Sequence, residues 1–338
     1  KCKFCAYPLI GKKKGDNSFL RDKECIKAEL QQNYDLYGTT KYVIIDDTFN
    51  EQTEKLQVIA DAIDELNLPE KLQFSSFIRI DLVAAFPEQI ELLKKINVCA
   101  WFLGVESLNY DSAKSIGKGC KKEKVFETIE KSKEAFGGSL SVYGSFIAGL
   151  PYDNKETMDE WTKELFERKD LFDAYSFSPL ELGTASELSQ RADYFGYTID
   201  RQSNMQNKWS NEYWNSDEVV EYVKELQEGY FDDIKVSTFF LMFYQCLGFS
   251  FEELRKMTFT ELFENPEIRK RARQYLHKSY YSKVEKFLGI QPAQTNVKYM
   301  KHLPVQDELK DALRKEFYEN EHKSKLYSAS NGKITRTL

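Results

Sequence analysis

The sequence predicts an α/β fold: a six-stranded, partial (β/α)6 TIM-like barrel followed by a mainly helical C-terminal segment. Five short apolar runs alternate with segments of helical periodicity between residues 20 and 180, and this alternation stops near residue 190. Alternation of strands and helices is typical of a parallel sheet with right-handed crossovers. The expected domains are residues 1–188 for the barrel, with its first strand before residue 1, and residues 189–338 for a helical cap or substrate domain.

The elements of the barrel follow from the spacing of apolar residues and from turn residues. Apolar runs bounded by polar or Gly/Pro residues predict strands, and apolar residues three to four positions apart predict helices. An open, doubly wound sheet is the alternative, but no Gly-x-Gly-x-x-Gly fingerprint is present. The predicted strands are residues 42–45, 73–78, 98–103, 140–148 and 174–180, and the predicted helices are residues 20–37, 56–66, 87–96, 121–136 and 154–166.

Composition restricts the classes of partner. The formal net charge is −6 over 338 residues, which argues against a surface that coats nucleic acid. A basic stretch at residues 269–273 keeps a nucleic-acid partner open without favouring it. No apolar run is long enough to span a bilayer, so we expect no membrane partner. The scattered cysteines beyond Cys5 are typical of buried thiols in a reducing cytoplasm.

The first two cysteines form the one closely spaced pair. Cys2 and Cys5 are separated by two residues, a spacing that also occurs in half of a zinc site or in a redox pair. A structural zinc site needs four ligands at local spacings. No second such pair exists, and the three histidines all lie in the last quarter of the chain, so zinc is not favoured.

Polar residues that follow the predicted strands are candidates for chemistry. In barrels of this kind the functional groups lie on loops at the carboxyl ends of the strands. Asp46 and Asp47 follow one strand, Arg79 and Asp81 the next, and Glu106 a third.

Several segments together resemble the radical S-adenosylmethionine (SAM) superfamily over roughly residues 1 to 182. Lys1-Cys2-Lys3-Phe4-Cys5 resembles the end of the superfamily's Cys-x3-Cys-x2-Cys cluster loop, whose first cysteine would lie before Lys1. Asp46-Asp47-Thr48-Phe49-Asn50 stands where the superfamily often has Gly-Gly-Glu; its Asp-Asp-x-Phe pattern is that of the branch with many cobalamin-dependent members. Gly104-Val105-Glu106-Ser107, with Ile116-Gly117-Lys118 downstream, resembles the fourth-strand segment. Residues 144–151, ending in Gly-Leu-Pro, resemble the fifth-strand segment.

The resemblance implies roles for the matching residues. Cys2 and Cys5 would be metal ligands of a [4Fe–4S] cluster and hence the catalytic residues, because iron–sulfur clusters are held by thiolates. The expected SAM contacts are Phe4 at the adenine, Asp47 at the methionine amino group, Glu106 at the ribose hydroxyls, Lys118 at the methionine carboxylate, Ser145, Ile147 and Gly149 along the adenine, and Tyr175 completing that wall.

Substrate would enter between the barrel mouth and the segment after residue 190. The residues expected to contact it are Asp46, Arg79, Asp81, Glu181, Trp209 and Trp214. Structural alternatives stay open for several site residues: Asp46 or Asp47 could cap the next helix, Gly149-Leu150-Pro151 could be only a tight turn, Glu106 could be structural, Arg79 and Asp81 could pair with each other, and Trp209 and Trp214 could join helices to the barrel.

The resemblance implies an enzyme that cleaves SAM reductively and starts a modification by abstracting hydrogen from a C–H bond. The Asp-Asp-x-Phe pattern adds C-methylation, and with it a transferase and a cobalamin cofactor, as one form of this reaction. The expected partners are a reductant of the flavodoxin or ferredoxin type and a small-molecule or peptide substrate. Two other classes stay open: a barrel that has lost activity and binds RNA or a peptide, and a metal-independent barrel enzyme with Asp47 and Glu106 as acid and base.

Overall fold

The computed structural model describes residues 2–5, 21–46, 48–168, 170–200, 208–230, 266–267, 270, 327–330 and 333–336. The chain divides into two compact units, residues 1–262 and 263–338. In the second unit the described strands β8 (Tyr327–Ser330) and β9 (Lys333–Arg336) form an antiparallel hairpin. The predicted boundary between residues 188 and 189 stays a prediction.

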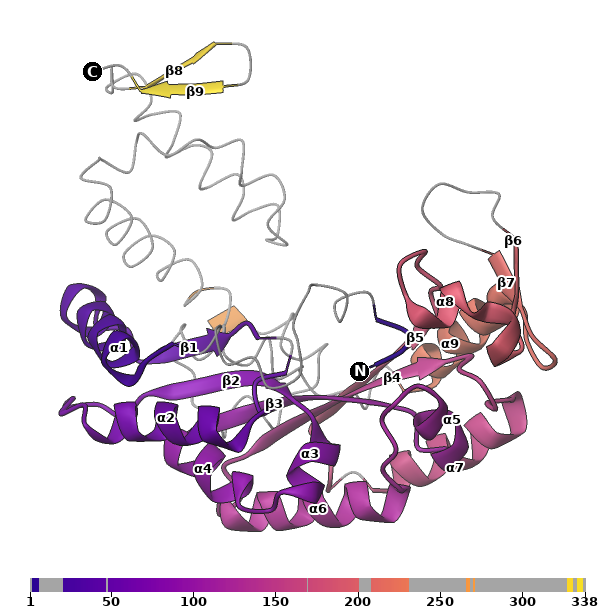
Figure 1. Cartoon of the computed structure of the whole chain (residues 1–338), viewed down its shortest axis with the longest axis horizontal. Helices are drawn as coiled ribbons and strands as arrows, with labels where there is room; N and C mark the ends of the chain where they lie inside the picture. Colours follow the sequence, from indigo (N-terminus) through magenta and orange to yellow (C-terminus); the bar gives the residue numbers. More distant parts are fainter. Residues whose placement is uncertain are drawn as a thin grey trace. The chain divides into compact units, whose positions relative to one another are not determined.

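The first unit is built on a parallel sheet of five strands in the order β1-β2-β3-β4-β5 (Figure 1). All five overlap the predicted strands, although β1 is shifted by one residue and β3 ends three residues later than predicted, so the α/β class and the parallel sheet are confirmed. Among the described residues the sheet is open, and the sixth strand and the closed side of a partial barrel stay predictions. The strands are β1 (Lys41–Ile44), β2 (Gln73–Ile78), β3 (Val98–Glu106), β4 (Ser141–Ala148) and β5 (Ala174–Pro179).

Helices connect the strands, and four of them lie along one face of the sheet: α2, α4, α6 and α7 (Figure 1). Two short helices, α3 and α5, were not predicted, because a helix of six residues is too short to show an apolar period. Pro87 was expected to open a helix, but the helix begins two residues later. The helices are α1 (Lys23–Tyr37), α2 (Thr53–Asp64), α3 (Ile80–Ala85), α4 (Gln89–Ile96), α5 (Tyr110–Ser115), α6 (Lys122–Ala135) and α7 (Lys155–Glu167).

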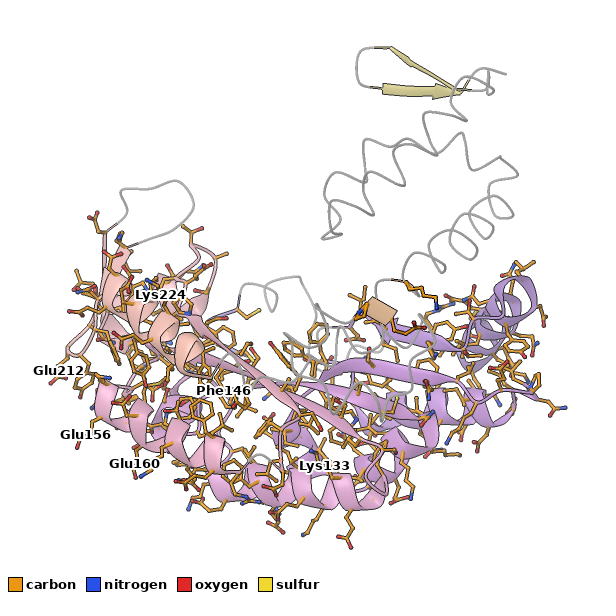
Figure 2. All side chains as sticks on the ribbon, turned by 180° about the vertical axis from the view of Figure 1, so that it is seen from behind. Lys133, Phe146, Glu156, Glu160, Glu212 and Lys224 are labelled. Atoms are coloured by element: carbon orange, nitrogen blue, oxygen red, sulfur yellow. The ribbon has the colours of Figure 1, made fainter. Side chains whose placement is uncertain are left out.

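Aromatic side chains fill the layer between the sheet and these helices. Phe146 of β4, labelled in Figure 2, packs against Trp161 of α7 with 5.4 Å between ring centroids and against Phe177 of β5 at the same distance. Glu156 and Glu160 project from the outer side of α7, away from the sheet. The helix α7 is therefore amphipathic: its apolar side chains face the sheet, and its charged side chains face away from it.

The segment after β5 packs against the carboxyl ends of β4 and β5. The Trp209 indole donates to the Leu180 carbonyl at 2.9 Å, and the Tyr197 hydroxyl donates to the Gly149 carbonyl at 2.7 Å. This segment was expected to be helical, but its described part also contains an antiparallel hairpin. Its elements are α8 (Glu187–Gln190), the 3-10 helix η2 (Ala192–Phe195), β6 (Thr198–Asp200), β7 (Lys208–Ser210) and α9 (Ser216–Tyr230).

Candidate cofactor-binding site

Cys2 and Cys5 lie on one turn, which backbone hydrogen bonds hold on two sides. The amide of Cys5 donates to the Cys2 carbonyl at 3.3 Å. The Lys3 amide donates to the Ile116 carbonyl at 3.0 Å, and the Lys3 carbonyl accepts from the Leu188 amide at 2.8 Å. Both thiols are free and partly exposed. The cysteine turn (residues 2–5) is therefore fixed relative to the segments after β3 and β5, and it presents two thiols that a metal cluster can use.

The Glu106 carboxylate is buried where β3 ends in a bulge. The pairing of β3 with β4 shifts between Gly104 and Glu106, and Glu106 has φ of 71°, which is uncommon for a residue with a side chain. A Cβ on Gly104 would lie 2.5 Å from Oε1 of Glu106, so glycine leaves the space that this carboxylate occupies.

One cation faces the Glu106 carboxylate directly. Lys118 Nζ lies 3.5 Å from Glu106 Oε1 and donates to the Gly104 carbonyl at 2.7 Å. Burial raises the pKa of Glu106, while Lys118 and Arg79 oppose that shift. Because both side chains are 9% exposed, this pair is an inward-facing charge pair and not a surface salt bridge.

Arg79 and Asp81 pair with each other, as one structural alternative expected. Arg79 Nε donates to Asp81 Oδ1 at 3.0 Å, and an Nη2 hydrogen reaches the Gly117 carbonyl at 3.4 Å. Asp81, and more weakly Cys2 and Glu106, raise the pKa of Arg79 against the effect of burial. The pairing does not exclude a contact with substrate, which stays a prediction.

Three consecutive residues after α5 connect these groups. Ile116 accepts from the cysteine turn, Gly117 accepts from Arg79, and Lys118 contacts Glu106. Residues predicted from three distant stretches of sequence are therefore brought together at the carboxyl edge of the sheet.

The prediction that Tyr175 completes the adenine wall is wrong. In a strand, side chains alternate between faces. Tyr175 pairs in register with Gly144 and packs against Phe166 of α7 at 5.1 Å between ring centroids, so it belongs to the helix-covered face. Ser145 and Ile147 lie on the other face, where their register partners are Ser176 and Ser178. Tyr175 therefore cannot complete a wall with Ser145, whereas the two serines of β5 can.

Gly149 was expected to be approached closely by the adenine, and in the structure the Trp209 side chain lies close to it. It has φ of 87°, and a Cβ there would lie 2.8 Å from the Trp209 ring. Trp209 and Trp214 are 3% and 6% exposed, and the Trp214 indole donates to the Asp153 carbonyl at 2.8 Å. The geometry favours the packing role for both tryptophans over contact with substrate.

The remaining predicted residues have separate surroundings. Asp46 accepts from the Thr48 amide at 3.1 Å and forms an ion pair with Lys55. It does not cap α2, whose N-cap residue is Gln52, because the turn at residues 48–51 intervenes. Phe4 is partly buried against the core, Glu181 is exposed, and Asp47 lies outside the described residues, as does most of the basic stretch at residues 269–273.

Two buried polar residues at this edge were not predicted. Asn50 is fully buried; its side chain accepts from the Arg79 amide at 2.8 Å and donates to the Arg79 carbonyl at 3.0 Å, which fixes the backbone of Arg79. Asp153 is also fully buried and accepts from Ser112 at 3.0 Å. The position of Asn50 at the end of a motif was a usable signal, but nothing local to Asp153 indicated its burial.

Comparison with known proteins identifies the family. Residues 1–165 match the sequence model of the Radical SAM superfamily. The predicted family is thus confirmed. A search of curated proteins found no match.

Solved structures of similar fold include three enzymes. The radical S-adenosylmethionine methyltransferase TsrM from Kitasatospora setae, with cobalamin and a [4Fe–4S] cluster bound, is 14% identical over 55% of this chain and 37% of that chain, with a TM-score of 0.42. Coproporphyrinogen III oxidase (HemN) from Escherichia coli is 12% identical over 68% and 49%, with a TM-score of 0.42. The cobalamin-dependent S-adenosylmethionine radical enzyme OxsB is 15% identical over 88% and 45%, with a TM-score of 0.44. The chain spans less than half the length of each of them.

The donor set at this edge fits the superfamily's cofactors in part. Cys2 and Cys5 supply two thiols, the preferred ligands of iron–sulfur clusters. Within the described ranges, no group of three or more His, Cys, Asp or Glu side chains is placed to hold a metal ion.

The described ranges contain no helix of the length and apolar character that a membrane span requires.

Proposed function

We propose that this chain uses one [4Fe–4S] cluster and SAM to start a radical modification of a substrate. Cys2 and Cys5 would bind the cluster together with a third cysteine that the superfamily's loop has upstream of this pair. The observation that carries the proposal is the contact of residues 116–118 with the cysteine turn, Arg79 and Glu106 in succession. It joins the predicted cluster ligands to the predicted SAM ligands through one short segment.

The residues of the chain bind and orient, while the bound cluster and SAM supply the radical that abstracts hydrogen. Glu106 would accept from the ribose hydroxyls, and Lys118 would pair with the methionine carboxylate, each a charge-assisted contact. Ser145 and Ile147, with Ser176 and Ser178, would line the adenine, and Phe4 would contact its edge. Asp47 and Gly149 keep their proposed contacts with the methionine amino group and the adenine.

The proposal extends to the wider reaction. C-methylation with cobalamin, and hence a transferase, is supported by the Asp-Asp-x-Phe pattern alone. A flavodoxin or ferredoxin would supply the electron, the substrate would be a small molecule or a peptide, and the enzyme would work in the cytoplasm. The sixth strand would complete a partial barrel, with Arg79, Asp81 and Glu181 toward its mouth.

Iron analysis of two cysteine variants tests the cluster. Cys2→Ala or Cys5→Ala is expected to remove the cluster's brown absorbance from full-length protein purified anaerobically, with the fold retained. Cys25→Ala is the matched control, because Cys25 is a free, exposed thiol on α1. Retention of about four irons per chain in the first two variants would show that they are not ligands. Wild-type protein without iron or sulfide would favour the acid–base enzyme or the inactive binding barrel.

A binding measurement tests the SAM contact separately. Glu106→Ala is expected to keep its iron and to lose roughly 1.5–3 kcal/mol of SAM binding, about ten- to a hundredfold in Kd by calorimetry. Glu164→Ala is a suitable control, because Glu164 also pairs with a lysine, Lys122, but on the outer helices. An unchanged Kd for Glu106→Ala would return Glu106 to a structural role.

A further inference from the structure

A buried carboxylate connects the two loops that follow β3 and β4. Asp153 lies two residues after Pro151 and is fully buried. Its Oδ2 accepts from Ser112 Oγ at 3.0 Å and from Ser107 Oγ at 3.3 Å. Its backbone carbonyl accepts from the Trp214 indole at 2.8 Å. No role in the proposed function uses Asp153, although its partner Ser107 directly follows Glu106.

The serine next to Glu106 is held from both sides. Ser107 Oγ accepts from the Asn109 amide at 3.0 Å as well as donating to Asp153. The Asn109 side chain donates to the Tyr152 carbonyl at 3.1 Å, which joins the same two loops a second time. A left-handed residue such as Glu106 persists where its surroundings over-determine its conformation. Among those surroundings, Asp153 is the buried residue whose carboxylate holds Ser107, the neighbour of Glu106.

We propose that Asp153 is a positioning residue: through Ser107 it holds the Glu106 carboxylate in the orientation that binds SAM. The part that concerns SAM rests on the proposed function. The part that concerns the conformation of Glu106 is a statement about the protein alone. Asp153 itself touches neither the carboxylate nor any predicted cofactor contact in the bonds described above.

The surroundings of Asp153 make this connection dependent on pH. From β3 and α5 it faces neutral hydroxyl groups, and the nearby titratable groups are Tyr197 before β6 and Tyr222 on α9. Among the described residues no lysine, arginine or histidine forms an ion pair with it. Desolvation therefore raises the pKa of Asp153 from 3.8 to about 7, against the hydrogen bonds from Ser112, Asn109 and Ser107. The ionised carboxylate accepts from both serines with charge-assisted bonds, which are stronger than the neutral ones.

Ser107→Ala tests the connection, because it removes one hydroxyl and leaves both carboxylates in place. We expect full-length protein that carries its cluster to bind SAM about five- to tenfold more weakly, with unchanged iron content. Hydrogen exchange in the metal-free protein should accelerate at residues 104–109 and not elsewhere. Ser132→Ala is the matched control: Ser132 is fully buried on α6 and bonds only to its own helix, at the Thr128 carbonyl.

Asp153→Asn provides the pH readout. SAM affinity of the wild type should rise from about pH 6 to about pH 8 more than that of the variant. The titration of Glu106 is common to both proteins, so the difference isolates Asp153. Equal pH profiles, or equal SAM affinity and exchange in Ser107→Ala and Ser132→Ala, would overturn the proposal. If wild-type protein with its cluster does not bind SAM, the proposed function is wrong, and the exchange experiment still decides the role of Asp153.

Discussion

The two ends of the sheet carry the same types of polar group in different surroundings. Arg79 and Asp81 at the carboxyl edge, and Arg168 and Asp170 before β5 at the amino edge, are both arginine–aspartate pairs separated by one residue. The first pair is 18% exposed on each side chain, and the second is 35% and 64% exposed. The same sequence spacing thus gives an inward-facing pair at one edge and a surface pair at the other.

Two buried aspartates, one at each edge, differ in their partners. Asp173 at the amino edge accepts from the Val142 amide at 2.8 Å and lies 3.1 Å from Lys133, which Figure 2 labels on α6. Asp153 at the carboxyl edge is bonded by neutral side chains, those of Ser107, Asn109 and Ser112. Lys133 compensates the charge of Asp173 at the amino edge, whereas Asp153 at the carboxyl edge has no such partner among the described residues and holds its charge at a cost in desolvation. This division is the one expected where binding groups gather at the carboxyl ends of parallel strands.

The largest expected effect concerns the aromatic packing that supports the carboxyl edge. Trp209→Ala removes a ring that is 3% exposed and in contact with Gly149, so we expect a loss of about 3–5 kcal/mol in the free energy of unfolding. Trp209→Phe keeps most of the volume and loses the bond to the Leu180 carbonyl, about 1 kcal/mol. Denaturant unfolding measures both. Two variants as stable as the wild type would restore the prediction that Trp209 contacts substrate.

The local sequence pattern was sufficient to predict the strands, but it did not predict which side chains face one another in the folded protein. The run Gln73–Ile78 was predicted to its ends, because Phe74, Phe77 and Ile78 lie in a short run between polar turns, a local pattern that is typical of a strand. Tyr175 was expected to complete the adenine wall but lies on the opposite face from Ser145, because the register of β5 with β4 decides which of its residues share a face. Glu106 could be selected as a strand-end carboxylate, whereas the contact of Ser107 with Asp153 joins residues 46 positions apart. Such contacts depend on how the loops pack, which no local pattern encodes.

The second prediction compares how the buried carboxylates of Asp153 and Asp173 contribute to the free energy of unfolding. Folding raises the pKa of Asp153 from 3.8 to about 7, so the unfolded chain releases this proton at lower pH than the folded protein. The contribution of Asp153 to stability is fully present below about pH 4 and is lost as pH rises to about 7, a change of roughly 4 kcal/mol. Asp153→Asn should remove this slope and be more stable than wild type at neutral pH.

Asp173→Asn should have the opposite sign. It leaves Lys133, which is 16% exposed, without its buried carboxylate, so we expect destabilisation of about 3 kcal/mol at neutral pH. Urea unfolding between about pH 5 and about pH 8 measures both variants. Destabilisation of similar size in both would show that Asp153 is compensated as Asp173 is, and the contrast between the edges would then fail.

The smallest expected effect compares the two arginine–aspartate pairs directly. Arg79→Met leaves Asp81 partly buried without its bidentate partner and removes the bond to the Gly117 carbonyl, so a loss of about 2–3 kcal/mol is expected. Arg168→Met breaks two exposed ion pairs, with Asp170 and with Glu130, each of which is worth less than about 1 kcal/mol. Because methionine retains the apolar volume of the arginine stem, the difference between the two unfolding free energies reports the charge interaction. Equal losses would mean that the low exposure of Arg79 and Asp81 does not strengthen their pairing. A loss at Arg79 together with weaker SAM binding would extend the carboxyl-edge site from Glu106 and Lys118 to the end of β2.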